Sequence, residues 1–260
     1  MQKKVGDITI HYVEQGEGFP VILLHGFPLD HTIWEATVTG MKSGARIIQP
    51  DLRGFGRSDA PEGVYSMRLL ADDVARLMDA LGLGMAVLVG HSMAGYLALE
   101  FAGAYPERLA GIGLVSTQAL ADTPERRSGR LAQAEDVLAH GPKTLASSMT
   151  PRLTADHQYH AEIYRIILRN QPNGLAGALK GMAERRNNTA LLPAIAVPSV
   201  VVAGLDDQLI PVERSREMAA SLPRVELVEI TGAGHMPMME KPVETASAID
   251  RLVLEVASLI

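Results

Sequence analysis

The sequence predicts a doubly wound α/β fold: a mostly parallel sheet of about eight strands with an inserted, all-helical cap. Three observations lead to this prediction. Short apolar runs alternate with amphipathic helical patterns over most of the 260 residues. The apolar runs are mostly continuous, as strands covered on both faces require. The alternation stops once, in a long stretch without a strand signal.

Seven runs have the length and composition of buried strands. Amphipathic helices lie between them, the clearest starting at about Ser66, where apolar residues recur at helical spacing as far as Leu81. Strands that alternate with helices in this way are typical of a doubly wound sheet. The seven runs are ITIHYV, VILLHG, RIIQPD, AVLVGH, GIGLVS, SVVVAG and VELVEI.

The alternation is interrupted between about Ala119 and Leu192. The run DTPE at 122–125 opens a helix, because it supplies a cap residue, a proline suited to the first turn and an early acid. Gly141-Pro142, Pro151 and Pro172 then divide the segment into several helices. We predict a core formed by residues 1–119 and 191–260, with residues 120–190 as a helical cap inserted after the sixth strand.

Composition narrows the class of function. The formal net charge is −6 and no block of lysine and arginine occurs, which argues against nucleic acid as a partner and favours a small molecule. Cysteine is absent, so disulfides, thiolate metal sites and a cysteine nucleophile are excluded. MQKKVGDITI lacks the apolar centre of a signal peptide, and no apolar run approaches the roughly 18 residues of a membrane span. We expect a cytoplasmic protein without membrane contact, and leave its oligomeric state open.

The stretch VLVGHSMAGYLALEF contains the strongest chemical signal. Gly90 and Gly95 have the spacing of a phosphate-binding loop, but the lysine and hydroxyl residue that such a loop needs do not follow. A nucleophile elbow requires small residues two before and two after the nucleophile, and Gly90 and Ala94 satisfy this around Ser92. The alternative is an ordinary serine that caps a helix after a strand.

A serine nucleophile needs a base and an acid, in the order Ser, Asp, His along a chain of this architecture. GLDDQLIP follows one strand and offers Asp206 and Asp207, of which spacing from Gly204 and Pro211 favours Asp207. TGAGHMPMMEKP follows the next strand and places His235 in a glycine-rich loop. Strand ends are where doubly wound sheets gather their sites.

These motifs together resemble the α/β-hydrolase superfamily with a helical cap, and the resemblance covers nearly the whole chain. It rests on HGFP, DLRGFGRSD, GHSMAG, the Gly204 to Pro211 loop and GAGHMPMMEKP. The resemblance implies Ser92 as nucleophile, Asp207 as acid and His235 as base, and no cofactor. It also implies an oxyanion hole formed by the backbone N–H groups of Phe27 and Met93. Ala94 departs from the more common glycine, which implies a slightly tighter elbow.

Other residues allow two interpretations. Trp34, Met149, Met236 and Arg152 are candidates for substrate binding, although core packing or solvation would also explain them. His25 and His91 are expected to have structural roles, and the charged residues of DLRGFGRSD to brace their loop. His157 and His160 have a spacing that could bind metal, but no third ligand is evident, so we expect a solvated helix face and no metal site.

The sequence therefore predicts a cofactor-independent serine hydrolase that cleaves small carboxylic esters or lactones through an acyl-enzyme. Among superfamily members it is most similar to small carboxylesterases and 3-oxoadipate enol-lactonases. The same residues would also serve a carbon–carbon bond hydrolase, or a cofactor-free perhydrolase or haloperoxidase. A ligand receptor with slow turnover is an alternative of a different class.

Overall fold

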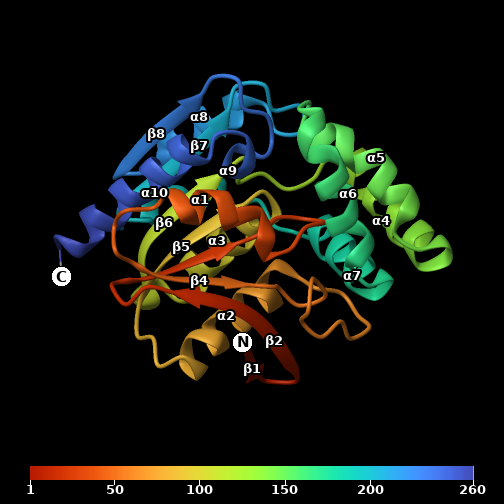
Figure 1. The fold of residues 1–260 in the computed structure, drawn as a ribbon, viewed down its shortest axis with the longest axis horizontal. Coiled ribbons are helices and arrows are strands. Elements are labelled where there is room, and N and C mark those ends of the chain that lie inside the picture. Colours follow the sequence, from red (N-terminus) through yellow and green to blue (C-terminus); the bar gives the residue numbers. More distant parts are fainter. Residues whose placement is uncertain (260) are drawn as a thin grey trace.

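An eight-stranded sheet runs through the molecule in the computed structural model, which describes residues 1–259 (Figure 1). The strand order is β1-β2-β4-β3-β5-β6-β7-β8. The pairs β1–β2 and β2–β4 are antiparallel, and every other pair is parallel. This confirms the predicted α/β fold class. The strands are β1 (Gln2–Val5), β2 (Ile8–Gln15), β3 (Pro20–Leu24), β4 (Arg46–Pro50), β5 (Ala86–His91), β6 (Leu109–Val115), β7 (Ser199–Gly204) and β8 (Val225–Ile230).

The central strands are apolar and fully covered. Every residue of β5 and β7 is buried, which explains why these runs are continuously hydrophobic. β8 forms one edge of the sheet, and its glutamates at 226 and 229 are accordingly exposed. β1 forms the other edge and was not among the seven recognised runs. Its sequence, QKKV, is polar because only Val5 reaches the core, so it carries no strand signal of its own.

Helices flank the sheet on both faces (Figure 1). α1 and α10 pack together on one face, and α2 packs with α3 on the other. α2 begins directly after Ser66, whose side chain accepts a hydrogen bond from the Leu69 N–H and so caps the helix as the sequence indicates. No helix within residues 1–259 is both long and apolar enough to cross a bilayer. The flanking helices are α1 (Glu35–Gly40), α2 (Met67–Ala80), α3 (Met93–Ala104), α8 (Val212–Ser221), α9 (Pro237–Glu240) and α10 (Pro242–Ala257).

Four helices lie between β6 and β7 in sequence and gather at one side of the molecule (Figure 1). They are α4 (Pro124–His140), α5 (Lys143–Leu153), α6 (His160–Arg169) and α7 (Pro172–Ala183). Thr123 caps α4, and Gly141 ends it with a positive φ of 79°. Pro151 does not separate two helices as predicted. It lies in the last turn of α5, where its missing N–H removes only one hydrogen bond, to the carbonyl of Ser147.

Helix α7 packs against the 54–66 loop at backbone contact distance. A Cβ added to Gly174 would lie 1.8 Å from the Gly54 oxygen, and one added to Gly181 would lie 1.7 Å from the Tyr65 oxygen. Between them, the Gly177 carbonyl accepts a hydrogen bond of 2.9 Å from the Tyr65 N–H. Glycines on one face of α7 therefore bring the helix into contact with the backbone of the loop, and the Tyr65 ring packs against the same face at Gly177.

We expect Gly181→Ala to destabilise the protein, because the new methyl group would overlap the Tyr65 carbonyl. Overpacking of this kind costs about 1–3 kcal/mol, and urea unfolding measures it. Gly129→Ala in α4 is the control, since a Cβ there meets nothing within 4 Å and alanine favours the helix by about 0.5–1 kcal/mol. Equal stability of the two variants would contradict the close packing of α7.

Candidate active site

Ser92 occupies a strained turn between β5 and α3. Its φ is 51° and its ψ is −111°, and it is one of two non-glycine residues with positive φ among residues 1–259. Gly90 makes the turn possible, because a Cβ at this position would lie 2.3 Å from the Ala94 oxygen. Ser92 is the N-cap residue of α3, but its hydroxyl makes no capping hydrogen bond. The hydroxyl is therefore available for chemistry, unlike that of an ordinary helix cap.

Neighbouring backbone holds the Ser92 turn in place. The Ser92 N–H donates to the Val115 oxygen at 2.9 Å, which ties the turn to the end of β6. The Ser92 carbonyl accepts from the Gly95 N–H at 2.9 Å and from the Thr117 hydroxyl at 2.7 Å. Gly95 must lack a side chain, because a Cβ would come within 2.4 Å of Thr117 Oγ1. The second glycine of the motif is thus a packing residue.

Asp207 and His235 form a buried hydrogen-bonded pair. His235 Nδ1 lies 2.8 Å from Asp207 Oδ2, and both side chains are 2% exposed. The other carboxylate oxygen of Asp207 accepts from the backbone N–H groups of Leu209 and Ile210. These bonds fix the carboxylate, so Nδ1 of His235 carries the proton and Nε2 is left to act as a base. Asp206 is exposed, and its backbone N–H donates to the Ala233 carbonyl in the His235 loop.

The loops that carry Asp207 and His235 meet because Gly204 has no side chain. A Cβ on Gly204 would lie 2.1 Å from the Gly234 oxygen. His91 supports the same loop, because its Nε2–H donates to the His235 carbonyl at 2.9 Å. The ring centroids of His91 and His235 lie 4.9 Å apart. Desolvation, and then the proximity of His235, keep the pKa of His91 well below its usual value. His91 is thus a neutral positioning group, in keeping with the structural role expected for it.

Glu240 links the same loop to the helices between β6 and β7. One of its carboxylate oxygens accepts from the Gly234 N–H at 2.7 Å, and the other accepts from the Thr154 hydroxyl. Close by, the Tyr159 hydroxyl donates to the Met239 carbonyl at 2.7 Å. The segment after α5 is therefore tied to the last two residues of α9, and through Glu240 to the His235 loop.

Two backbone N–H groups near Ser92 have no acceptor. Phe27 lies in the turn after β3, and Met93 is the first residue of α3. Within residues 1–259, neither N–H donates a backbone or side-chain hydrogen bond. An N–H at the start of a helix is suited to stabilise an oxyanion, and the two groups are those that the sequence resemblance implies.

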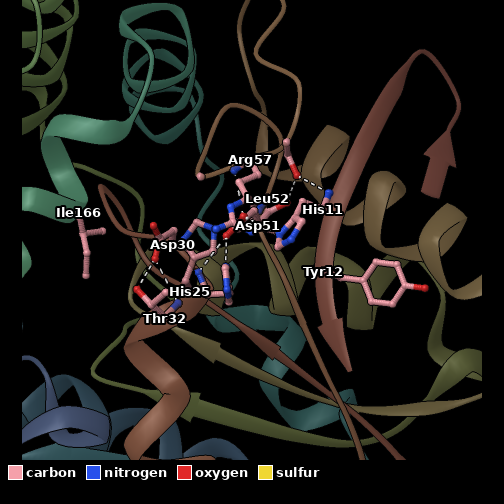
Figure 2. A network of polar contacts seen from close by, with 12 residues as sticks. His11, Tyr12, His25, Asp30, Thr32, Asp51, Leu52, Arg57 and Ile166 are labelled. Atoms are coloured by element: carbon pink, nitrogen blue, oxygen red, sulfur yellow. Dashed lines mark hydrogen bonds and ion pairs between the residues drawn. The ribbon is translucent and has the colours of Figure 1, made fainter. Parts of the chain in front are cut away.

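A network centred on Asp51 braces the 25–31 loop, of which Phe27 is part (Figure 2). Nδ1–H groups of His11 and His31 donate to the two oxygens of Asp51, at 3.0 and 2.6 Å. His25 accepts from the Leu52 N–H at 2.9 Å through Nε2 and donates through Nδ1 to the Gly26 carbonyl. Burial alone would raise the pKa of Asp51, but the hydrogen bonds and charge of His31 hold it well below its usual value.

The same three side chains, His11, His31 and Asp51, have ligand atoms within 4.8 Å of one another, as a metal site would need. Both imidazoles, however, turn Nδ1 towards the carboxylate, so hydrogen bonding accounts for their arrangement. The bracing role predicted for the DLRGFGRSD loop fits this network, since the Arg57 N–H also donates to Asp51 at 3.0 Å.

A cavity of about 190 Å³ opens above Ser92 and His235. Met149 and Arg152, two of the four predicted substrate-binding residues, line it. Trp34 and Met236 do not, because both side chains are fully buried elsewhere in the core. Most of the residues that line the cavity were not predicted from the sequence to bind substrate. The remaining lining residues are Phe27, Tyr96, Arg126, Gly129, Arg130, Gln133, Met182, Leu209 and Ile210.

The helical spacing of four lining residues on α4 is the one sequence pattern that could have indicated this part of the cavity wall. Arg126, Gly129, Arg130 and Gln133 follow each other at i, i+3, i+4 and i+7, so they share one face of the helix. Polar residues at this spacing are usually solvent-facing, and the pattern alone does not separate the two cases. Only the position of α4 over the strand ends makes this face a pocket wall.

Buried histidines should make the fold sensitive to acid. Desolvation lowers the pKa of His25 and His91, so both stay neutral in the folded protein but bind a proton near pH 6.5 once unfolded. The unfolded chain then binds more protons below pH 6.5, and the free energy of unfolding should fall from about pH 6.5 to pH 5. The pKa of His11 is also lowered, whereas that of His31 is raised and partly opposes the effect.

Urea unfolding at pH 7.5, 6.5, 5.8 and 5.0 measures this dependence. Each neutral buried histidine contributes up to about 1.4 kcal/mol per pH unit. His91→Gln keeps a donor for the His235 carbonyl but does not titrate, so the slope should be smaller in this variant. A flat profile in the unmodified protein over this range would contradict the neutral state of the two histidines.

The chain is similar to known proteins in both sequence and structure. A family model described as "alpha/beta hydrolase fold" matches residues 20–242. An esterase from Thermogutta terrifontis, in its malate-bound form, is 41% identical and superposes with a TM-score of 0.95, over 98% of this chain and 99% of that one. An enol-lactonase from Burkholderia xenovorans LB400 is 25% identical with a TM-score of 0.87, over 99% and 100% of the two chains.

Among curated sequences, the AB hydrolase superfamily protein YisY of Bacillus subtilis is 29% identical over 253 residues. The alignment spans 93% of this chain and 94% of that protein. The similarity thus extends through both the sheet and the helices between β6 and β7.

Proposed function

The chain belongs to the family of the α/β-hydrolase fold, and we propose that it is a serine hydrolase that cleaves small carboxylic esters or lactones. One observation carries the proposal. A half-buried serine, held at positive φ with no capping hydrogen bond, borders the same small cavity as a histidine bound to a buried aspartate. The similarity to an esterase over nearly the full length of both chains supports ester bonds as the target.

In the proposed reaction, Ser92 Oγ attacks the carbonyl carbon while His235 Nε2 takes its proton. His235 then returns the proton to the leaving alkoxide, and an acyl-enzyme forms on Ser92. Asp207 keeps the imidazole in the required tautomer and stabilises the imidazolium. The N–H groups of Phe27 and Met93 hold the tetrahedral oxyanion. Water, activated by His235, releases the acid, so the cycle needs no cofactor.

Residues 120–190 are proposed to act as a cap over this site. Helices α4, α5 and α7 supply Arg126, Met149, Arg152 and Met182 to the cavity wall, and Glu240 connects the segment to the His235 loop. A wall built from an inserted segment lets substrate choice vary independently of the chemistry. The cavity volume of about 190 Å³ is below the range of about 300–1,000 Å³ that drug-sized ligands need, which favours small substrates.

An enol-lactonase activity is the second candidate. It is supported by the enol-lactonase from Burkholderia xenovorans among the similar structures and by the arginines in the cavity wall. A panel of short-chain esters, lactones and enol-lactones ranks the two activities. The same panel, extended to carbon–carbon bond substrates and to peroxide-dependent bromination, tests the other chemistries. A receptor would bind these compounds with little or no turnover.

We expect Ser92→Ala to abolish turnover of a short aryl ester, because the variant has no other nucleophile at the site. Labelling by an organophosphonate should be lost as well. The melting temperature serves as the control and should stay close to that of the unmodified protein, since alanine makes the same backbone hydrogen bonds. Substantial ester hydrolysis by the purified variant would refute Ser92 as the nucleophile.

Asp207→Asn should lower kcat by up to about 10⁴-fold, because an amide cannot hold the His235 tautomer or stabilise its positive charge. Asp206→Asn is the matched control, one residue away on the same loop but exposed and without contact to the imidazole. Its kcat should remain within about twofold of the unmodified value. Steady-state kinetics on one ester compares the two, and the reverse ranking would overturn the assignment of the acid.

A further inference from the structure

The cavity above Ser92 has a strongly cationic wall. Arg126 and Arg130 lie one turn apart on α4, and Arg152 reaches the same cavity from α5. Lining residues of the described chain include no aspartate or glutamate. This concentration of positive charge runs against the formal net charge of −6 of the whole protein. Composition therefore does not explain it.

Only one of the three arginines is neutralised by a carboxylate. Arg130 Nε lies 2.6 Å from Asp122 Oδ2, so this pair is structural. Among residues 1–259, Arg126 and Arg152 have no carboxylate partner within 4.0 Å. Arg126 Nη2 instead donates to the Leu209 carbonyl at 3.3 Å, two residues after Asp207. Two guanidinium groups at the cavity thus keep most of their donors free.

The rest of the cavity lining is mainly apolar. Phe27, Met149, Met182, Leu209 and Ile210 contribute hydrophobic surface. The Tyr96 ring borders the cavity and has the Arg185 guanidinium 4.3 Å from its centroid, while Arg185 itself is paired with Asp122. A ligand that matches this lining has a short apolar chain with an anionic group at one end.

We propose that Arg126 and Arg152 form a carboxylate subsite, and that the substrates are small esters or lactones carrying a free carboxylate. Half-esters of short dicarboxylic acids and carboxylated lactones belong to this class. The inference rests on the proposed function, since it places the ester carbonyl at Ser92. Guanidinium groups suit this role because they bind carboxylates through paired, charge-assisted hydrogen bonds and stay charged at any working pH.

The subsite also defines the selectivity. A neutral ester of the same length fills the apolar part of the cavity but offers no anion to the two guanidinium groups. Arg126 and Arg152 are both exposed, so solvent screens each ion pair, and one pair contributes up to about fivefold in binding. We therefore expect the two pairs together to give discrimination of about tenfold in kcat/KM between an anionic ester and its neutral counterpart.

The test compares the 4-nitrophenyl monoesters of glutaric and adipic acid with the same compounds methylated at the free carboxyl. The variants are Arg126→Met, Arg152→Met and the double variant, each assayed on both members of a pair. Every variant should reduce the preference for the anionic ester, by about tenfold in the double variant. Arg127→Met is the matched control. Arg126 and Arg127 are both exposed on this helix, but Arg127 does not line the cavity, so the preference should not change.

A second measurement needs no variant. Glutarate should inhibit hydrolysis of a neutral ester competitively, at concentrations about tenfold lower than glutaramide, and added salt should weaken this inhibition. Melting temperatures show whether a variant is folded. Where a methionine variant is not, Arg126→Gln or Arg152→Gln replaces it.

Failure of the hydrolase proposal and failure of the subsite proposal give different experimental results. Loss of the serine hydrolase proposal would appear as no turnover of either ester and no effect of Ser92→Ala. Loss of the subsite alone would appear as turnover of both esters with no preference for the anion. Equal inhibition by glutarate and glutaramide, or an equal change of both substrates in the arginine variants, would likewise overturn the subsite while leaving the hydrolase intact.

Discussion

The structure depends on the backbone turn at Ser92, where β5 becomes α3 with a positive φ. The turn exists only because Gly90 leaves room for the Ala94 carbonyl and because β6 holds the Ser92 N–H. Everything else near the site is placed relative to it. The parallel order of β5, β6, β7 and β8 brings the carboxyl ends of these strands to one edge of the sheet, so the loops after them converge on the serine.

The site also depends on glycines that let neighbouring segments of the chain come into close contact. Gly204 lets the Asp207 loop touch the His235 loop, and Gly95 lets α3 touch Thr117. In each case the glycine is needed for space and not for an unusual φ. Such contacts fix functional groups to within a narrow range, because an oxygen atom packed against a Cα carbon leaves no room for adjustment.

Much of this arrangement was predictable from the sequence, for identifiable reasons. The buried strands were recognised because continuous apolar runs are required by a covered parallel sheet, and the GHSMAG turn because its small residues are sterically necessary. The motifs implied Ser92, Asp207 and His235 by their order along the chain. Spacing alone favoured Asp207 over Asp206 as the acid but did not decide between them. In the structure, Asp207 is the residue that hydrogen-bonds to His235.

Other features were not predictable. The β1 strand consists of QKKV, and only pairing with β2 makes it a strand. Arg126 and Arg130 look like ordinary surface arginines, because a helix face that lines a cavity and one that faces solvent share the same spacing. Trp34 could be either core or pocket by sequence, and its position in the turn before α1 buries it completely. These outcomes depend on tertiary packing, which local sequence does not encode.

The glycine contacts of α7 have a consequence for how such a protein changes over evolutionary time. Substitution at Gly174 or Gly181 would push the helix off the 54–66 loop. The face of α7 that meets the core therefore cannot accept larger residues at these positions. At Gly129, which lines the cavity from α4, an added Cβ meets nothing within 4 Å, so this position is under no such restriction. New substrate preferences would therefore arise by exchange of residues that face the cavity, while the glycine face of α7 stays in contact with the core.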